Sequence, residues 1–216
     1  MTNLVPGTKL VIEEKVMINI GILASGRGTN LQAIIEAVED GRIEGKIKIV
    51  ISDNSDAYAL KRAEQNNIDT QYIDFKSFKN REDYDKKVIE CLKEKGVELI
   101  VLAGYMRILT PYFIKTCKNR IINIHPALLP SFPGLHAQRQ AIEYGAKVSG
   151  CTVHFVDEGV DSGPIVLQRA VEIKDDDTEE SLAERILKEE HQIYPQAIQL
   201  FTKGRLMIKG RRVFIK

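Results

Sequence analysis

The stretch VMINIGILASGRGTNLQAIIEAVEDG, residues 16–41, passes from an apolar segment through a glycine-rich loop into an amphipathic segment. The run 16–25 is nearly continuous in apolar residues, which is typical of a parallel strand buried on both faces. Leu31, Ile34, Ile35 and Val38 then recur at the spacing of one helix face. The stretch therefore predicts a strand, a loop and a helix, the repeating unit of α/β folds.

The same alternation continues along the chain. Apolar runs predict strands at 46–52, 70–75, 97–104 and 121–125, and amphipathic segments predict helices at 57–65, 81–95 and 110–119. The fold class is therefore α/β, with a doubly wound, mostly parallel sheet of the Rossmann-like kind.

The pattern changes in the C-terminal half. After a helix at 136–145, two longer strands at 147–158 and 163–173 are separated by a turn-rich loop, so we expect them to pair antiparallel. A long helix follows at 175–204, and the tail 205–216 has the pattern of a hairpin centred on glycine.

Domain boundaries follow from the same reading. No linker, repeat or low-complexity tract interrupts the chain, so residues 17–216 are predicted to form a single domain. Residues 1–16 are predicted to be an N-terminal extension, with an extra strand around Lys9–Ile12.

Composition excludes several classes of protein. The chain has 216 residues and a net charge of +1, so no bulk field attracts nucleic acid or an acidic membrane. No apolar run approaches the roughly 18–20 residues of a membrane span, and no signal peptide is recognisable. We expect a cytoplasmic monomer or homodimer. The widely spaced Cys91, Cys117 and Cys151 are expected to be packing residues in a reducing compartment, and no metal site is expected.

The glycine-rich loop ILASGRGTN, residues 22–30, lies where a parallel sheet offers helix N–H groups to an anion. Gly28, Thr29 and Asn30 would hold a monophosphate there. A tight turn with a helix cap and no ligand is the alternative.

Two nucleotide-binding motifs fit this loop less well. A Walker A loop fails because Arg27 and Gly28 replace the lysine and the hydroxyl residue. A dinucleotide loop matches Gly26 and Gly28, but Leu31 replaces its third glycine. Asp53, after the second strand, would be the ribose ligand of an NAD-dependent oxidoreductase.

A polar pair lies in IINIHPALLPSFPG, residues 121–134. Asn123 and His125 are two apart, so they share a face at the end of a buried strand. An amide and an imidazolium there could stabilise an oxyanion, and three prolines would stiffen the following loop. A hydrogen-bonded core pair is the alternative.

A carboxylate beside His125 would raise its pKa. The loop DEGVDSGP, residues 157–164, supplies Asp157, Glu158 and Asp161, and spacing alone leaves all three open.

Other polar residues have no obvious role from spacing. His154 is expected on the surface of a strand, and Glu190 with His191 on a solvated helix face. No motif supports a covalent nucleophile.

Four segments together resemble a known family. These are ASGRGTNLQAII (24–35), VLAGYMRIL (101–109), NIHPALLPSFPGLHAQRQAIEYG (123–145) and GCTVHFVDEGVDSGPIVLQ (150–168). They resemble the formyltransferases that use 10-formyltetrahydrofolate, in one register over about residues 17–205. The loop GxG[ST]N is most similar to the branch whose acceptor is glycinamide ribonucleotide (GAR), in purine synthesis.

The resemblance implies a reaction and its catalytic residues. The GAR amine attacks the formyl carbon of 10-formyltetrahydrofolate, giving N-formyl-GAR and tetrahydrofolate. Asn123 and His125 would stabilise the oxyanion. Asp161 would orient and charge the histidine and assist proton transfer. The folate is a co-substrate, and no metal is implied.

The resemblance also implies the binding residues. Gly28, Thr29 and Asn30 would hold the GAR phosphate, and Glu190 its ribose hydroxyls. The residues implied for folate are Arg81, Met106, Arg107, Ile108, Leu109, Asp157, Glu158 and Val160.

Three other enzymes and one binding function remain as alternatives. Methionyl-tRNA formyltransferase carries an added C-terminal domain, and formyltetrahydrofolate deformylase carries an N-terminal regulatory domain and lacks the phosphate loop. An NAD-dependent oxidoreductase would be stabilised by NAD and not by folate. A non-catalytic binding module would have no catalytic rate, and His125→Ala would leave its ligands bound.

Overall fold

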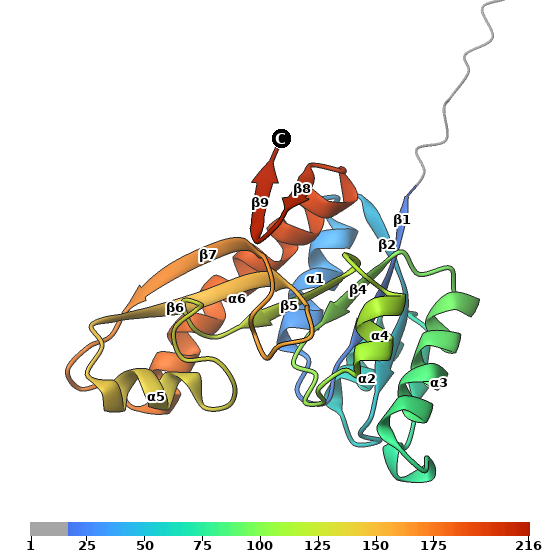
Figure 1. Cartoon of the computed structure of the whole chain (residues 1–216), viewed down its shortest axis with the longest axis horizontal. Coiled ribbons are helices and arrows are strands. Elements are labelled where there is room, and N and C mark those ends of the chain that lie inside the picture. The colour runs from blue at the N-terminus through green and yellow to red at the C-terminus, as the bar shows by residue number, and fades with distance from the viewer. Residues whose placement is uncertain (1–16) are drawn as a thin grey trace, which may run out of the picture.

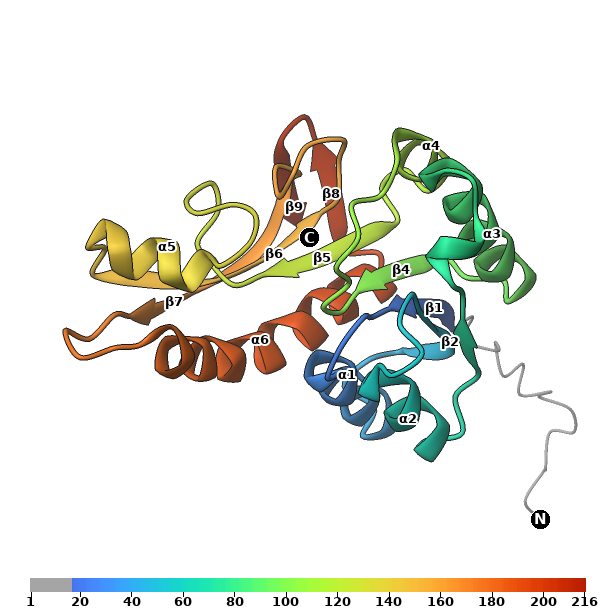
Figure 2. The same ribbon diagram turned by 90° about the horizontal axis from the view of Figure 1, so that it is seen from below.

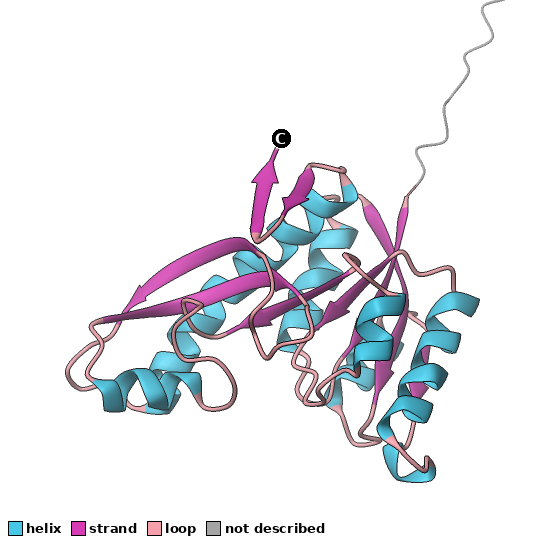
Figure 3. Cartoon of the chain, viewed as in Figure 1, coloured by secondary structure: helices cyan, strands magenta, loops and turns pink. Residues whose placement is uncertain are grey.

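A computed structural model describes residues 17–216, so the predicted extension 1–16 and its strand around Lys9–Ile12 lie outside the described residues. The described residues form one nine-stranded sheet with the order β3-β2-β1-β4-β5-β6-β7-β9-β8. Helices cover both of its faces (Figures 1 and 3).

The first half of the chain builds the parallel part of the sheet. Strands β1 to β5 pair parallel throughout. The elements are β1 (Ile18–Leu23), α1 (Thr29–Glu39), β2 (Gly45–Ser52), α2 (Tyr58–Gln65), β3 (Thr70–Tyr72), the 3₁₀ turn η1 (Phe75–Ser77), α3 (Arg81–Glu94), β4 (Leu99–Leu102), α4 (Pro111–Thr116) and β5 (Ile121–His125).

The second half extends the sheet with antiparallel strands. Its elements are α5 (Ala137–Tyr144), β6 (Val148–Phe155), β7 (Ile165–Glu172), α6 (Glu179–Thr202), β8 (Leu206–Lys209) and β9 (Arg212–Ile215). β6 pairs antiparallel with both β5 and β7, and β8 with β9. The predicted mostly parallel sheet with antiparallel C-terminal strands is therefore confirmed.

The boundaries differ from the predicted ones by up to four residues; the strand predicted at 70–75, for example, ends at Tyr72. The largest difference lies at the start of the last long helix. The last long helix was expected from residue 175, but α6 begins at Glu179. Thr178 and Ser181 each bond the other's backbone N–H through their side chains, a capping box that fixes the start there. The preceding acidic residues are instead part of a turn in which Asp177 pairs with Arg185.

The sheet separates two apolar clusters, one on each of its faces. Along β1, Ile20 and Ile22 belong to the cluster under α1, α2 and α6, whereas Leu23 belongs to the cluster under α3 and α4. Figure 2 shows these two groups of helices on opposite faces. Burial on both faces explains why the central strands are continuous apolar runs rather than alternating ones. All three cysteines are free and buried, as predicted for packing residues.

Among residues 17–216, no helix combines the length and the apolar character needed to cross a membrane.

Tyr194 connects α6 to the two central strands. Its ring is fully buried, and its hydroxyl lies 2.8 Å from the carbonyl oxygen of Leu102 and 3.1 Å from that of Ile122. The hydroxyl donates to these carbonyls, which belong to the last residue of β4 and the second residue of β5.

We expect Tyr194→Phe to lower the free energy of unfolding by about 1–2 kcal/mol, because a buried hydrogen bond is lost and its acceptors stay buried. Urea unfolding measures this change. Tyr144→Phe is the control, since that ring is 81% exposed. Equal stability of the two variants would contradict the assigned role of the Tyr194 hydroxyl.

Candidate active site

The strand order reverses between β1 and β4, so the loops that follow these strands diverge over opposite faces of the sheet. In open α/β sheets ligands bind at the carboxyl ends of the strands beside such a switch point. Three segments leave the sheet there: residues 25–30 of the glycine-rich loop after β1, the 104–109 segment after β4 and the 126–136 loop after β5. Residues 25–30 are called the phosphate loop below, after their expected ligand. The predicted site residues lie on these segments and on two others that approach them, the 157–163 loop and α6.

The phosphate loop presents the open start of a helix. Gly28 is the N-cap of α1 and adopts a left-handed conformation with φ of 69°, and no side chain caps the helix there. A Cβ at Gly28 would lie 2.8 Å from the Cα of Ala59, so α2 approaches too closely for any other residue. The first N–H groups of α1 are thus available to an anion, as the loop sequence predicts.

Glu190 lies beside this helix start. It is 6% exposed, and its carboxylate accepts a hydrogen bond of 2.8 Å from the side-chain nitrogen of Asn30. Burial raises the pKa of Glu190 to about 7, and the hydrogen bond from Asn30 offsets only part of the shift. The expectation of a solvated helix face is therefore wrong for Glu190, because α6 packs this face onto the sheet and α1.

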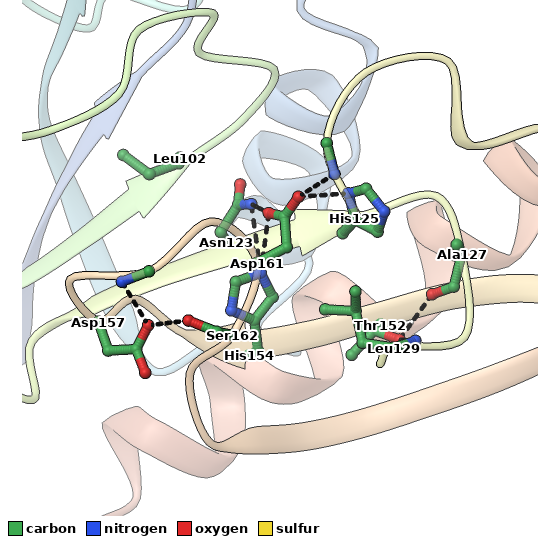
Figure 4. A network of polar contacts seen from close by, with 12 residues as sticks. Leu102, Asn123, His125, Ala127, Leu129, Thr152, His154, Asp157, Asp161 and Ser162 are labelled. Carbon is green, nitrogen blue, oxygen red and sulfur yellow. Dashed lines mark hydrogen bonds and ion pairs between the residues drawn. The ribbon is translucent and has the colours of Figure 1, made fainter. Parts of the chain in front are cut away.

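A second polar group lies at the end of β5. His125 is buried, and its Nδ1 is 3.2 Å from Oδ2 of Asp161. The amide nitrogen of Asn123 is 3.5 Å from Oδ1 of the same carboxylate. The backbone N–H of Gly134 donates to Asp161 at 2.8 Å. Figure 4 shows the Asp161 carboxylate pointing between these groups.

The structure distinguishes the three acidic candidates. Asp157 is turned away from His125 and accepts hydrogen bonds from the Ser162 hydroxyl at 2.5 Å and the Gly159 N–H at 3.2 Å (Figure 4). Glu158 is exposed and lies 3.7 Å from Lys115. Asp161 is therefore the partner of His125, and Asp157 instead shapes the loop that carries Asp161.

His154 is a buried member of the group rather than the surface residue that we expected. β6 pairs with β5 so that His154 is opposite Asn123. The Nε2 atom of His154 lies 3.3 Å from the Asn123 amide nitrogen and 3.6 Å from Asp161. Strand alternation alone gave no sign of this, because β6 is buried on both faces between β5 and β7.

Burial lowers the pKa of His125 below its ordinary value, and the Asp161 carboxylate and the Phe132 carbonyl oppose this shift without reversing it. The carboxylate therefore raises the pKa of His125 as expected, but desolvation has the larger effect. Nε2 of His125 is 2.8 Å from the Phe132 carbonyl oxygen, which only accepts. Both ring nitrogens thus face acceptors, and only the imidazolium can donate to both.

The pKa of Asp161 lies below its ordinary value. Burial opposes ionisation of this carboxyl group, but the His154 ring, the Gly134 N–H and the charge on His125 together outweigh burial. Asp161 is therefore ionised at neutral pH and able to stabilise positive charge on the ring beside it.

The loop after β5 is held by side chains of the antiparallel strands. The Thr152 hydroxyl donates to the Ala127 carbonyl at 2.7 Å and accepts from the Leu129 N–H at 3.0 Å (Figure 4). Gln168 donates to the Leu129 carbonyl and to the Thr152 hydroxyl. Proline content predicts a stiff loop, and these contacts show what fixes its position.

A cleft of about 450 Å³ opens beside the Asn123, His125 and Asp161 group. Seven of the eight residues expected to bind folate line it: Met106, Arg107, Ile108, Leu109, Asp157, Glu158 and Val160. The eighth, Arg81, donates a hydrogen bond to the Ile108 carbonyl and so holds the rim of the cleft. The residues expected to bind GAR do not line this cleft; they lie at the start of α1 and, for Glu190, on α6 beside it.

The C-terminal hairpin contacts the loop that carries Asp161. A guanidinium nitrogen of Arg211 donates to the Ser162 carbonyl at 2.6 Å, and β9 pairs with β7 at Arg212 and Ile165. The tail 205–216, to which the sequence assigned no function, thus supports the 157–163 loop.

The fold and the site together define an α/β enzyme with an anion-binding helix start and a buried Asn–His–Asp group at the switch point of its sheet. The chain belongs to the formyl transferase family, whose sequence profile matches residues 18–198. It is 44% identical over 188 residues to phosphoribosylglycinamide formyltransferase of Escherichia coli, over 87% of this chain and 89% of that protein.

Two further comparisons agree. A crystal structure of glycinamide ribonucleotide transformylase 1 from Symbiobacterium toebii matches with a TM-score of 0.92 and 53% identity, over 97% of this chain and 98% of that one. The trifunctional purine biosynthetic protein adenosine-3 of Drosophila melanogaster is 47% identical over 191 residues. That match covers 88% of this chain but only 14% of the fly protein's length.

We expect Gly28→Ala to destabilise the fold by about 1–3 kcal/mol, because alanine is strained at positive φ and its methyl group meets the α2 backbone. Urea unfolding measures the loss. Gly26→Ala is the matched control, since a Cβ there has no atom within 4 Å in the described residues. Comparable losses in both variants would show that the close approach to Ala59 is not what requires glycine.

Proposed function

We propose that this chain transfers the formyl group of 10-formyltetrahydrofolate to the amine of GAR, giving N-formyl-GAR and tetrahydrofolate. The observation that carries the proposal is the His125–Asp161 pair, 3.2 Å apart beside Asn123 at the wall of a cleft. The phosphate loop adjoins that cleft, because the Ser25 N–H donates to the carbonyl of Gly104, which lines it.

GAR would bind at a second subsite, next to the cleft, formed by the start of α1 and Glu190. Its phosphate would accept hydrogen bonds from the N–H groups of Gly28, Thr29 and Asn30 at the positive end of α1. Its ribose hydroxyls would donate to Glu190, whose position is fixed by Asn30. A buried carboxylate that bonds two hydroxyls regains the hydrogen bonds that it lost on burial, which favours its ionised form.

The folate would occupy the cleft beside His125. A volume of about 450 Å³ suits a flat, drug-sized ring system. Exposed apolar side chains at the rim, Met106, Ile108 and Val160, can cover such a ring. Arg107 is held over the Phe75 ring and lies 3.5 Å from Asp53, so its guanidinium is positioned at the edge of the cleft.

Attack by the neutral amine makes the formyl oxygen an anion and the attacking nitrogen a cation. The Asn123 amide would donate to that oxygen. The His125 ring would also donate to it, by exchanging its present contact with the Phe132 carbonyl for the oxyanion. Donors of this kind contribute about 3–4 kcal/mol each to lowering a barrier in other oxyanion sites. The low-dielectric surroundings of His125 strengthen these hydrogen bonds, because little water competes for the donors.

Transfer is complete when the attacking nitrogen has lost one proton and the departing folate nitrogen has gained one. Asp161 is the carboxylate best placed to assist, through water, since it already contacts His125 and Asn123. It also stabilises the imidazolium as negative charge develops nearby. The nucleophile belongs to GAR, so the protein needs no nucleophilic side chain, and proximity of the two substrates supplies much of the acceleration.

The other enzyme candidates have less support. For an NAD-dependent oxidoreductase, Leu31 is fully buried where the motif requires glycine, and Asp53 is already bonded to Ser25 and paired with Arg107. Among formyl-transferring enzymes, the similarity to proteins named for GAR favours GAR over tRNA or water as the acceptor. A cytoplasmic location and a monomeric or homodimeric state remain predictions.

We expect Asp161→Asn to lower kcat by two or more orders of magnitude, because the charge that stabilises the His125 imidazolium is lost. A spectroscopic assay with GAR and a 10-formylfolate analogue measures this. Asp175→Asn, an equal loss of charge at an exposed turn, is the control. An unchanged rate in Asp161→Asn would remove Asp161 from the mechanism, and absence of any wild-type rate would overturn the proposed reaction.

We expect the affinity for N-formyl-GAR to rise with pH through about pH 7, because Glu190 ionises there and then accepts from the ribose hydroxyls. The formylated product is the right probe, since it has no amine to titrate. Calorimetry from pH 5.5 to 8.5 measures the affinity. The phosphate also titrates near pH 6, so Glu190→Gln is the control. The same pH profile in both proteins would exclude Glu190.

A further inference from the structure

The two proposed subsites are connected through one small side chain. Ser25 stands at the start of the phosphate loop, three residues before Gly28. Its hydroxyl donates to Oδ1 of Asp53 at 2.6 Å and accepts from the backbone N–H of Met106 at 3.0 Å. Ser25 thus bonds directly to the segment after β4 that lines the cleft.

Asp53 makes a second connection between the same parts. While Oδ1 accepts from Ser25, Oδ2 lies 3.5 Å from a guanidinium nitrogen of Arg107. Arg107 is itself stacked on Phe75, with its guanidinium carbon 3.3 Å from the ring centroid. The chain of contacts therefore runs from the phosphate loop through Ser25 and Asp53 to Arg107 at the cleft.

The Met106 backbone is not fixed by its own side chain, which is 69% exposed. The residues that follow are held separately, since Arg107 stacks on Phe75 and Leu109 is buried. The Met106 N–H would lose its acceptor if the hydroxyl were removed. The backbone bond from the Ser25 N–H to the Gly104 carbonyl would remain, so the fold at the end of β4 would be preserved.

We infer that Ser25 is a positioning residue that couples binding at the two subsites, so that GAR on the phosphate loop raises the affinity of the 104–109 segment for the folate, and the reverse. This inference rests on the proposed function. A ligand that orders one of two bonded loops lowers the entropy cost of ordering the other. Such coupling is reciprocal, so each ligand raises the affinity for the other by the same factor.

The test is a binding cycle with GAR and tetrahydrofolate, a pair that cannot react because no formyl group is present. Calorimetry gives the dissociation constant of each ligand, alone and with the other saturating. For the wild type we expect coupling of about 5-fold or more, the lower end of typical values. Ser25→Ala should bind each ligand alone within about 3-fold of the wild type and show coupling close to 1.

Three variants separate the contributions. Ser25→Thr keeps the hydroxyl and should retain the coupling. Asp53→Asn keeps an acceptor for Ser25 but loses the charge that faces Arg107, so it should reduce the coupling in part. Asn54→Ala is the matched control, because the Asn54 side chain donates to the Ser25 carbonyl at 3.2 Å and so holds the phosphate loop from the β2 side alone. It should leave the coupling unchanged.

The outcomes distinguish the two proposals. Equal coupling in the wild type and Ser25→Ala, with both ligands bound, would overturn the role of Ser25 and leave the proposed reaction intact. Loss of coupling in Asn54→Ala to the same extent as in Ser25→Ala would also overturn it, since any loosening of the phosphate loop would then suffice. If neither GAR nor tetrahydrofolate bound the wild type, the proposed function itself would fail.

Discussion

The arrangement of the site depends on the position of one carboxylate. Asp161 is ionised and largely buried, and such a charge is tolerated only where hydrogen bonds and opposite charge surround it. The Gly134 N–H, the His125 ring and the Asn123 amide supply these partners from two other segments. Asp161 itself adopts a φ of 49°, a conformation that side chains other than glycine rarely take and that surrounding contacts must maintain. The Asp161 carboxylate therefore connects the 157–163 loop to β5 and to the 126–136 loop.

The sheet explains why these segments meet. Parallel strands β1, β4 and β5 deliver the phosphate loop, the 104–109 segment and the Asn123–His125 pair to one edge. β6 then pairs antiparallel with β5, with Thr152 opposite His125 and Phe155 opposite Ile122, so it runs away from that edge. This register places His154 directly opposite Asn123. The 157–163 loop therefore begins beside the start of β5, and it carries the Asp161 carboxylate back to Asn123 and His125.

Local sequence was sufficient to predict a residue's role where its environment is determined by residues nearby in the chain. The apolar runs and helical spacings predict the sheet, the glycine loop predicts an open helix start, and Asn123 and His125 follow from strand alternation. It was insufficient for groups brought together over long separations. His154 reads as a surface residue because a strand buried on both faces has no alternation to interpret. Glu190 reads as solvated because its partner Asn30 lies 160 residues earlier in the chain. The pKa of His125 required the extent of burial, which no spacing reveals.

The sequence by itself determined the fold class, the resemblance to formyltransferases and the identity of the glycine loop and the Asn123–His125 pair, because each depends on contiguous residues with a fixed period or motif. Spacing left Asp157, Glu158 and Asp161 open, and the resemblance favoured Asp161, but only the tertiary structure places its carboxylate beside His125. Only the tertiary structure likewise buried His154 and Glu190 and bonded Ser25 to the segment that lines the cleft. These outcomes depend on which loops the sheet order brings within about 3 Å of one another, the range of a hydrogen bond. That proximity is a property of the assembled strands and not of any one segment.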